Sequence, residues 1–360
     1  MIFHVNKETR MAKKKKVRLQ DIAEKTGYSI STISHVINKT RNVDPGTRDV
    51  VLKALDDLGY QLPSKRNQLT KSETLGVVIA DIRVDFFDEL IKELEDIAYE
   101  YGYHIVVMDS EENPKKELYC IRKLIDIGVA GIVLAPCNTK ADLSFCADFP
   151  IVQVDRMLDA DYFDFVGIDN MMSSYYLTRK LLMKGRDRIA LITFTDNNYC
   201  ARERRKGYTL AMMENGTYRS EHTLVISYDA DTNHETISRF IRQHTDVDTI
   251  ICASSNICYE VLCEIKQLGA DTHIKNVCTF DNNKWLDHVA FPVDAISQPI
   301  TDIACIAIDL LKTKIVDRSS PGGQKRIILN SCIEGRSELF IGGSESSLRS
   351  YEGEADTKEA

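Results

Sequence analysis

The sequence predicts a small all-α domain followed by a larger α/β domain with two doubly wound parallel sheets. Two short helical patterns separated by a tight turn lie within residues 17–38. From Leu75 onward, short apolar runs alternate with longer segments of helical periodicity. Continuous apolar strands of this kind are typical of a parallel sheet that is covered by helices on both faces. A chain of 360 residues also exceeds the usual size of one domain, so at least two are expected.

The first helical pattern has a clear apolar face and a clear end. Leu19, Ile22 and Ala23 recur at helical spacing. Gly27 follows, and glycine at such a position favours the left-handed backbone that ends a helix. We therefore expect a short helix that stops at Gly27 with a positive φ.

The second helical pattern begins after Ser29, which stands where an N-cap belongs. Ile33, Val36 and Ile37 are expected to pack inward. The opposite face is then short, polar and free of carboxylates, as a surface that meets phosphates and base edges must be. This arrangement indicates a helix-turn-helix unit that binds DNA, and an ordinary helical hairpin is the alternative. The outward residues are Ile30, Ser31, Ser34, His35 and Asn38.

Residues 17–62 resemble the helix-turn-helix headpiece of the lactose-repressor (LacI) family of bacterial regulators. The matching positions are residues 21–23, 27, 29, 32–38, 45, 47–48, 51, 54 and 58–60. The resemblance implies that the second helix enters the major groove of double-stranded DNA, and that a dimer binds a pseudo-palindromic operator. The DNA contacts that it implies are Ser29, Ile30, Ser31, Thr32, Ser34, His35 and Asn38.

A linker is expected between the headpiece and the α/β domain. Residues 63–74 are polar and rich in turn-forming residues. In the LacI family this linker holds a short hinge helix that orders on DNA and inserts a leucine into the minor groove. Leu69 stands at the matching spacing after Tyr60, which implies this role, and an ordinary exposed leucine is the alternative.

Charge is divided unevenly along the chain. Residues 1–75 carry a net charge of +7 and the remaining residues −15, within the overall net charge of −8. A basic N-terminal part on an acidic body suits a protein that binds a polyanion at one end. We expect residues 1–16 to form a disordered basic arm and residues 343–360 to form a disordered tail.

The composition argues against several classes of protein. The ten cysteines are scattered without a Cys-x-x-Cys pair, so neither a zinc site nor a disulfide framework is expected. No apolar run is long enough to span a bilayer, and the basic N-terminus lacks the apolar stretch of a secretory signal. There is no glycine-rich phosphate loop, paired-carboxylate spacing with a nucleophile, or metal-ligand cluster. The sequence therefore favours a cytoplasmic protein that is not an enzyme and uses no cofactor or metal.

The alternating part of the chain resembles the bilobed, periplasmic-binding-protein-like effector domain of the same family. Strands are expected at residues 75–80, 105–108, 131–134, 151–154, 189–193, 223–227, 249–253 and 276–279. Helices are expected at residues 86–101, 115–127, 173–184, 202–214, 235–244 and 258–268. The resemblance assigns residues 75–342 to this domain, with lobe 1 at about 75–171 plus 298–330 and lobe 2 at about 172–297 plus 331–342.

The loops at the carboxyl ends of the strands are the expected effector site, since doubly wound sheets bind ligands there. By the resemblance, Arg204 donates to ligand oxygens and Asp281 accepts from ligand hydroxyls, which suits a sugar or sugar derivative. A structural ion pair of these two residues across the lobes is the alternative. Tyr228 or Trp285 would supply an aromatic platform. The effector residues taken from the resemblance are Phe87, Asp155, Arg204, Ser255, Asn256, Asp281, Trp285 and Gln298.

The resemblance, together with these patterns, implies a homodimeric, sequence-specific transcriptional repressor whose operator affinity is controlled by a small carbohydrate effector. The effector is either an inducer or a corepressor. A global carbon-catabolite regulator with a phosphorylated carrier protein as corepressor is the alternative within the family. A bilobed solute-binding receptor is less favoured, because the headpiece is attached and a signal is missing.

Overall fold

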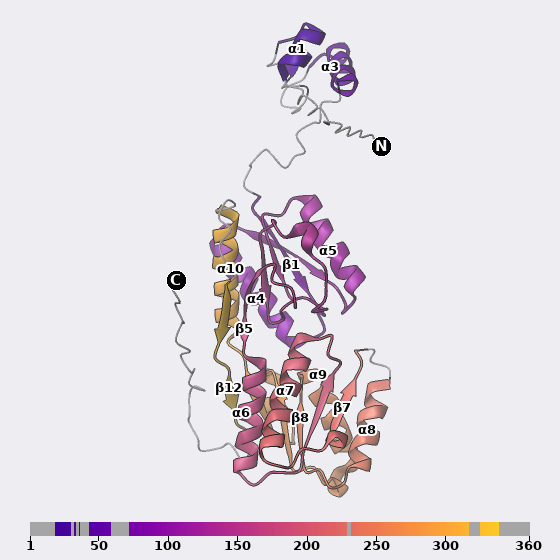
Figure 1. The fold of residues 1–360 in the computed structure, drawn as a ribbon, viewed down its shortest axis with the longest axis vertical. Helices are drawn as coiled ribbons and strands as arrows, with labels where there is room; N and C mark the ends of the chain where they lie inside the picture. The colour runs from indigo at the N-terminus through magenta and orange to yellow at the C-terminus, as the bar shows by residue number, and fades with distance from the viewer. Residues whose placement is uncertain are drawn as a thin grey trace, which may run out of the picture. The chain divides into compact units, whose positions relative to one another are not determined.

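The computed structural model describes residues 19–29, 32–33, 36, 43–58, 72–228, 232–316 and 325–337. The chain divides into two compact units, Met1–Thr70 and Lys71–Ala360 (Figure 1). Each unit has a hydrophobic core of its own.

The first unit packs helix α1 (Leu19–Thr26) against helix α3 (Pro45–Asp57). Gly27 ends α1 with a φ of 73°, which confirms the expected left-handed turn. The Gly27 amide donates to the carbonyl of Ala23 at 2.8 Å. The apolar faces meet in a single core, as in other small helical domains. Its buried members are Ile22, Ile33, Val36, Val51, Ala54 and Leu55.

The second helical pattern of this unit is described in part. Thr32, Ile33 and Val36 lie in helical backbone. The Thr32 amide donates to Ser29 Oγ at 3.2 Å, which is the N-cap contact that the sequence predicts. Ile33 and Val36 are buried, as predicted, whereas Ile37 lies outside the described residues.

The second unit contains two α/β lobes, and lobe 1 holds a six-stranded parallel sheet of order β11-β5-β4-β3-β1-β2. Helices α4 (Asp85–Glu100) and α10 (Ile300–Val316) cover one face, and α5 (Pro114–Ile127) covers the other. The strands are β1 (Thr74–Ile79), β2 (His104–Asp109), β3 (Ile132–Leu134), β4 (Ile151–Val154), β5 (Asp164–Ile168) and β11 (Arg326–Leu329).

Lobe 2 repeats this architecture with the sheet order β12-β10-β9-β8-β6-β7, in which only β12 is antiparallel to its neighbour among the strands described. One face is covered by helices α6 and α7 and the other by α8 and α9. The helices are α6 (Asn170–Met183), α7 (Tyr199–Glu214), α8 (Asn233–Gln243) and α9 (Ser255–Leu268). The strands are β6 (Ile189–Phe194), β7 (Thr223–Ile226), β8 (Thr249–Cys252), β9 (Asn276–Phe280), β10 (Val293–Ser297) and β12 (Cys332–Glu334).

The chain passes between the lobes at three places: from β5 to α6, from β10 to α10, and from β11 to β12 (Figure 1). Strands β5, β10, β11 and β12 are absent from the strands predicted above. In β5 the reason is that the strand begins with Asp164 and that Gly167 interrupts its apolar run. Asp164 is nevertheless buried. It accepts from the Lys325 amide at 2.8 Å and pairs with Lys314 Nζ at 3.1 Å.

All four helices of lobe 2 begin two or three residues earlier than the sequence predicts, and for α7 and α9 the N-cap explains the early start. Helix α7 starts at Tyr199 and not at residue 202, because Asn198 caps it by accepting from the Ala201 amide at 2.9 Å. Helix α9 starts at Ser255 and not at residue 258, with Ser254 as its N-cap. Both early starts lie at the carboxyl ends of strands, so the first helical turns border the region where a ligand is expected.

Helices α6 and α7 pack closely because of a glycine. A Cβ atom on Gly207 would lie 2.0 Å from the carbonyl oxygen of Met171 and 2.8 Å from the amide nitrogen of Tyr175. Only a residue without a side chain fits between the two helix backbones. This contact holds α6, the helix that enters lobe 2, against α7, which begins at the cleft.

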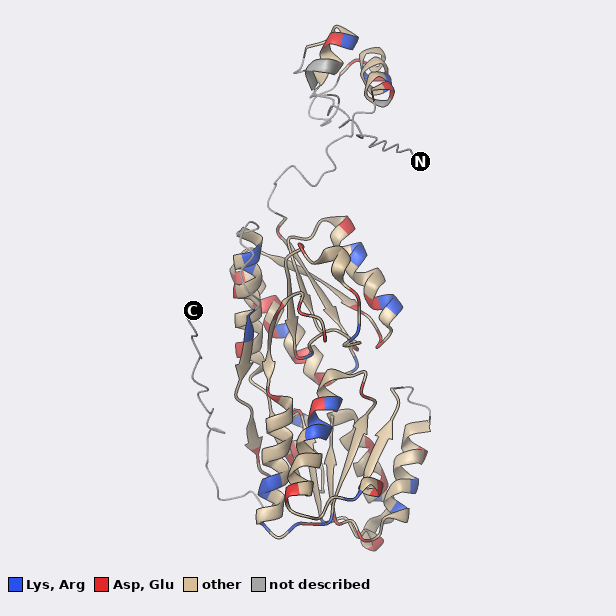
Figure 2. Cartoon of the chain, in the orientation of Figure 1, with Lys and Arg blue, Asp and Glu red and all other residues tan. Residues whose placement is uncertain are grey.

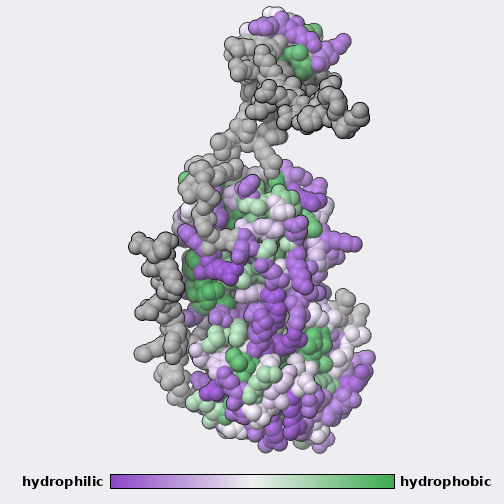
Figure 3. Space-filling view, in the orientation of Figure 1, coloured by the Kyte–Doolittle hydropathy of each residue, from purple (hydrophilic) through white to green (hydrophobic). Residues whose placement is uncertain are grey.

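The surface of the second unit is mixed in charge and mostly hydrophilic on the visible face (Figures 2 and 3). Acidic and basic side chains are interspersed over both lobes. Among the residues that the structure describes, no helix combines the length and the apolar character needed to cross a membrane. No group of acidic, histidine or cysteine side chains in this part of the chain is arranged to hold a metal ion.

Candidate functional site

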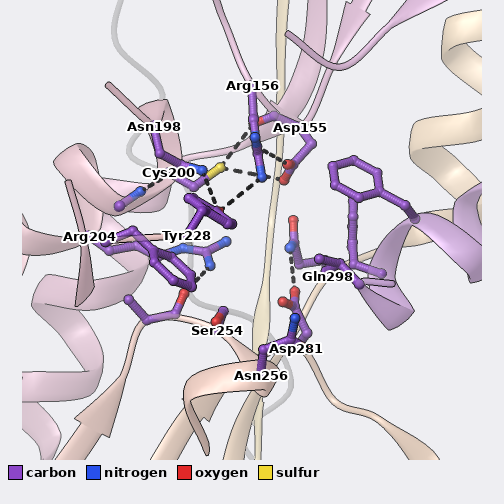
Figure 4. Close-up of a pocket in the computed structure, with 16 residues that line it drawn as sticks. Asp155, Arg156, Asn198, Cys200, Arg204, Tyr228, Ser254, Asn256, Asp281 and Gln298 are labelled. Atoms are coloured by element: carbon purple, nitrogen blue, oxygen red, sulfur yellow. Dashed lines mark hydrogen bonds and ion pairs between the residues drawn. The ribbon is translucent and has the colours of Figure 1, made fainter. Parts of the chain in front are cut away.

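A pocket lies between the two lobes, at the carboxyl ends of their strands (Figure 4). Lobe 1 contributes Val84, Phe86, Phe87, Asp155 and Arg156. Lobe 2 contributes Phe194, Asn198, Cys200, Ala201, Arg204, Tyr228, Ala253, Ser254, Asn256 and Asp281, and the crossover to lobe 1 contributes Gln298.

Two aspartates enter the pocket from strained backbone. Asp155 follows β4 with a φ of 60°, and Asp281 follows β9 with a φ of 72°. Each non-glycine residue in this left-handed region costs about 1 kcal/mol or more. Burial raises the pKa of Asp155, although Arg156 and Arg204 oppose this rise. The strain and the burial are retained at matching positions of the two lobes, as is common where side chains are held for binding.

Arg156 is buried in the pocket and contacts residues of both lobes through its guanidinium group. Its Nη1 lies 2.8 Å from Glu112 Oε1, and its Nη2 donates to the hydroxyl of Tyr228 at 3.3 Å. Its Nε lies 3.5 Å from Asp155 Oδ2. Burial is the largest single effect and opposes the charged form, but Glu112, Tyr228 and Asp155 together outweigh it and raise the pKa of Arg156 above its usual range. Arg156 therefore stays charged and is neutralised locally.

Arg204 is held by neutral acceptors of its own lobe. Its Nε donates to Asn170 Oδ1 and its Nη1 to the Ala253 carbonyl, both at 2.7 Å. The guanidinium carbon lies 3.9 Å from the centre of the Phe280 ring. Asp281 belongs to the same lobe and forms no ion pair with Arg204 among the described contacts. The alternative of an ion pair across the lobes is therefore wrong.

Gln298 lies between the two pocket aspartates and is hydrogen-bonded to one of them (Figure 4). Its Nε2 donates to Asp281 Oδ1 at 2.7 Å. Its Oε1 is buried and has no partner in the described part of the chain. Figure 4 shows the amide between Asp281 and Asp155. The free amide oxygen can accept a hydrogen bond from a bound molecule.

An aromatic platform is formed by Tyr228. Its ring stacks on Phe194 with a centroid separation of 3.9 Å and an interplanar angle of 16°. Its hydroxyl also accepts from Asn198 Nδ2 at 2.8 Å. The ring is thus fixed in the pocket by stacking and by two hydrogen bonds. Of the two aromatic residues considered from the sequence, the structure brings Tyr228 and not Trp285 into the pocket.

The structure brings six of the eight effector residues named from the sequence into this pocket: Phe87, Asp155, Arg204, Asn256, Asp281 and Gln298. Ser255 does not line it: this residue is the first of α9, and its side chain is buried. Trp285 is also outside, and its indole nitrogen donates to Asp85 Oδ2 at 3.0 Å.

Sequence reasoning left several pocket residues out of that set, among them Arg156, Asn198 and Cys200. Asn198 carried a usable signal, since an asparagine between a strand and a helix is a typical N-cap at the edge of a cleft. The thiol of Cys200 lies 3.4 Å from the carbonyl oxygen of Asp155 in the opposite lobe. Nothing in the sequence around Cys200 indicates this contact.

Most of the DNA contacts named from the sequence fall outside the described residues, namely Ile30, Ser31, Ser34, His35, Asn38 and Leu69. Ser29 and Thr32 are described. Their side-chain oxygens lie 2.9 Å apart at the start of the second helical pattern.

The chain matches family models along most of its length. Residues 18–63 match the model of bacterial regulatory proteins of the lacI family, and residues 72–282 match that of periplasmic binding proteins and the sugar-binding domain of the LacI family. This pair of domains defines a class, the ligand-controlled transcriptional regulators. The chain belongs to the LacI family. It is a DNA-binding transcriptional repressor with an effector domain of the sugar- and metabolite-binding kind.

Curated relatives are transcriptional regulators and not enzymes. The catabolite control protein A of Priestia megaterium is 26% identical over 312 residues, which cover 84% of this chain and 94% of that protein. The sucrose operon repressor of Lactococcus lactis subsp. lactis is 28% identical and covers 83% of this chain and 93% of that protein. Among solved structures, the Cra transcriptional dual regulator of Pseudomonas putida in complex with fructose 1-phosphate has a TM-score of 0.65. It is 22% identical and covers 74% of this chain and 99% of that chain.

Proposed function

We propose that this repressor acts as a homodimer on a pseudo-palindromic operator and is controlled by a small carbohydrate bound between its lobes. The observation that carries the proposal is the pocket itself, in which buried acceptors and an arginine face one another beside an aromatic ring. Carboxylates accept hydrogen bonds, the guanidinium donates them, and an aromatic face stacks on a sugar ring.

The proposed control is a population shift between two arrangements of the lobes. The pocket is shared by both lobes, so a ligand that contacts both stabilises one arrangement over the other. In a dimer, this change would alter the spacing of the two headpieces and so the operator affinity. Because the effector is either an inducer or a corepressor, the sign of the change is left to the experiment.

The DNA part of the proposal assigns Ile30, Ser31 and His35 to base edges. Thr32 and Asn38 are assigned to phosphates, as are Ser29 and Ser34, and Leu69 to the minor groove. Fluorescence anisotropy with operator-like palindromes should give tight, salt-dependent binding that His35→Ala weakens. Equal affinity for every duplex of the same length would contradict sequence-specific recognition.

The effector part is tested by a thermal-shift screen with sugars on Arg204→Gln, with Arg205→Gln as the matched control. Arg204 is buried in the pocket, whereas its neighbour Arg205 forms a peripheral ion pair with Asp196. The stabilisation produced by a binding sugar should be lost in Arg204→Gln and kept in Arg205→Gln. Equal stabilisation of both variants would remove Arg204 from the binding site.

A second candidate function follows from one relative. The similarity to a catabolite control protein supports a global carbon-catabolite regulator, whose corepressor would be a phosphorylated carrier protein. Addition of such a carrier protein would then raise the operator affinity. The similarity to the sucrose operon repressor supports a repressor controlled by a sugar equally well. The pocket between the lobes favours this sugar-controlled repressor.

We further propose that the protein is not an enzyme, that it needs no cofactor, and that it acts in the cytoplasm at the nucleoid. The regulators among its relatives support the first point, and the DNA-binding role supports the last. Turnover of any sugar or sugar phosphate by the purified chain would contradict the first point.

A further inference from the structure

An acidic side chain, that of Glu112, lies directly behind Arg156 in the pocket. We propose that Glu112 neutralises Arg156 and thereby restricts the pocket to uncharged, hydroxyl-rich ligands, to the exclusion of phosphorylated ones. This inference rests on the proposed function of the pocket as the effector site.

Of the two arginines that line the pocket, Arg156 is the one whose charge is paired with a carboxylate. The ion pair with Glu112 is short, at 2.8 Å, and both side chains are more than nine-tenths buried. The Tyr228 hydroxyl accepts from Nη2 at 3.3 Å, and Asp155 Oδ2 lies 3.5 Å from Nε without a hydrogen bond. A phosphate at this guanidinium would have to compete with a buried carboxylate for the same positive charge.

The summed charge of the pocket also disfavours an anionic ligand. Arg156 and Arg204 are opposed by Asp155 and Asp281 in the lining and by Glu112 directly behind it. Three acidic side chains thus face two basic ones. Even with Asp155 protonated, the charges would only balance. Such a site repels a phosphate dianion, because like charges at short range in a buried site are costly.

Two acceptors in the pocket can still take hydrogen bonds from a bound ligand. Gln298 Oε1 is buried and has no described partner, and the buried carboxylate of Asp155 has only the ion pair with Arg156 and the thiol of Cys200 beside it. Ligand hydroxyls can donate to both acceptors, whereas a phosphate oxygen can only accept.

Glu112 is held in place by its backbone. It lies in the turn after β2 with a φ of 52°, and its amide donates to the Ala80 carbonyl at 2.7 Å. Its neighbour Glu111 has almost the same φ, 51°, but pairs with the more exposed Lys116 at 2.7 Å. Two adjacent glutamates therefore share one conformation and differ in the cation that they neutralise, which provides a matched control.

The test compares wild type, Glu112→Gln and Glu111→Gln by isothermal titration at constant ionic strength. The probes are inorganic phosphate, glucose and glucose 6-phosphate, fructose and fructose 1-phosphate. Glu112→Gln frees the charge of Arg156, so its affinity for the phosphate-bearing probes should rise by at least about tenfold over wild type. Glu111→Gln should equal wild type. No gain in Glu112→Gln, or the same gain in Glu111→Gln, would overturn the inference.

Wild type alone provides a second measurement, which stands if Glu112→Gln does not fold. Each phosphorylated sugar should bind more weakly than its parent sugar, and tighter binding of a phosphorylated member overturns the inference. Operator binding is measured on the same preparations. Loss of sequence-specific DNA binding would count against the proposed function, whereas wrong charge selectivity with normal DNA binding would count against this inference only.

Discussion

The carboxylate of Asp85 in lobe 1 accepts a hydrogen bond from the indole nitrogen of Trp285 in lobe 2 at 3.0 Å. Asn283 Nδ2 donates to the same oxygen at 2.5 Å. Asp85 is the first residue of α4, and the two donors lie after Asp281, Asn283 just before the short 3-10 helix Lys284–His288 and Trp285 within it. This contact joins the two lobes next to the pocket and includes the only tryptophan of the chain.

Trp285 should therefore report on the arrangement of the lobes. We predict that Asp85→Ala changes the tryptophan emission of the free protein, because the indole loses its partner across the lobes. The contact is partly exposed, so its loss should cost only about 1 kcal/mol of stability. Asp88→Ala, one turn along the same helix, removes no contact with Trp285 and should leave the emission as in wild type. Identical spectra of all three proteins would contradict the described contact.

A second prediction concerns the close packing of α6 and α7. Gly207→Ala forces a methyl group against the Met171 carbonyl, so the helices must separate. We expect a loss of about 3 kcal/mol in the free energy of unfolding, near the upper end for overpacked sites. Met213→Ala on the same helix alters an exposed side chain and should stay within about 0.5 kcal/mol of wild type. Urea unfolding checks both values, and equal stability of the two variants would contradict the packing described.

The third prediction concerns the buried carboxyl group of Glu117. Its side chain is fully buried in α5 and accepts from the Cys137 amide at 2.5 Å. Burial raises its pKa from 4.5 to about 7. The folded state thus holds this proton more tightly than the unfolded state, so the contribution of Glu117 to stability is full below about pH 4.5 and is lost as the pH rises through about 7.

Glu117→Gln removes this titration. The variant should gain stability relative to wild type between about pH 5 and about pH 8, by at most about 3 kcal/mol. Unfolding by urea at a series of pH values measures the difference. A constant difference between variant and wild type over this range would show that Glu117 does not titrate there.

The fourth prediction separates folding from DNA binding in the headpiece. Ser29→Ala removes the N-cap contact to the Thr32 amide and should destabilise the headpiece by about 1 kcal/mol. Ser29→Asp keeps a capping oxygen, so the headpiece should remain stable. If this helix start faces phosphates, the new carboxylate should still weaken operator binding. Undiminished operator affinity of Ser29→Asp would place Ser29 away from the DNA.

Much of the fold could be predicted because its signals are local. The runs of β1, β3 and β8 are short and rich in β-branched residues, and they are strands in the structure. Strand β5 could not be predicted because its own composition does not indicate a strand. It is a strand because it pairs with β4 and β11. The early starts of α7 and α9 depend on caps that a helical period does not reveal.

The sequence by itself determined the order of the elements, the turn at Gly27 and the family to which the chain belongs, because these depend on neighbouring residues. Six pocket residues could be named from the family resemblance, but how the pocket side chains pair depends on the tertiary structure alone. Arg156 contacts Glu112 and Tyr228, which are 44 and 72 positions away in the chain. Glu112 reaches Arg156 because the strands that precede them belong to one sheet, and Tyr228 reaches it because the two lobes meet. No local period or spacing encodes such partners.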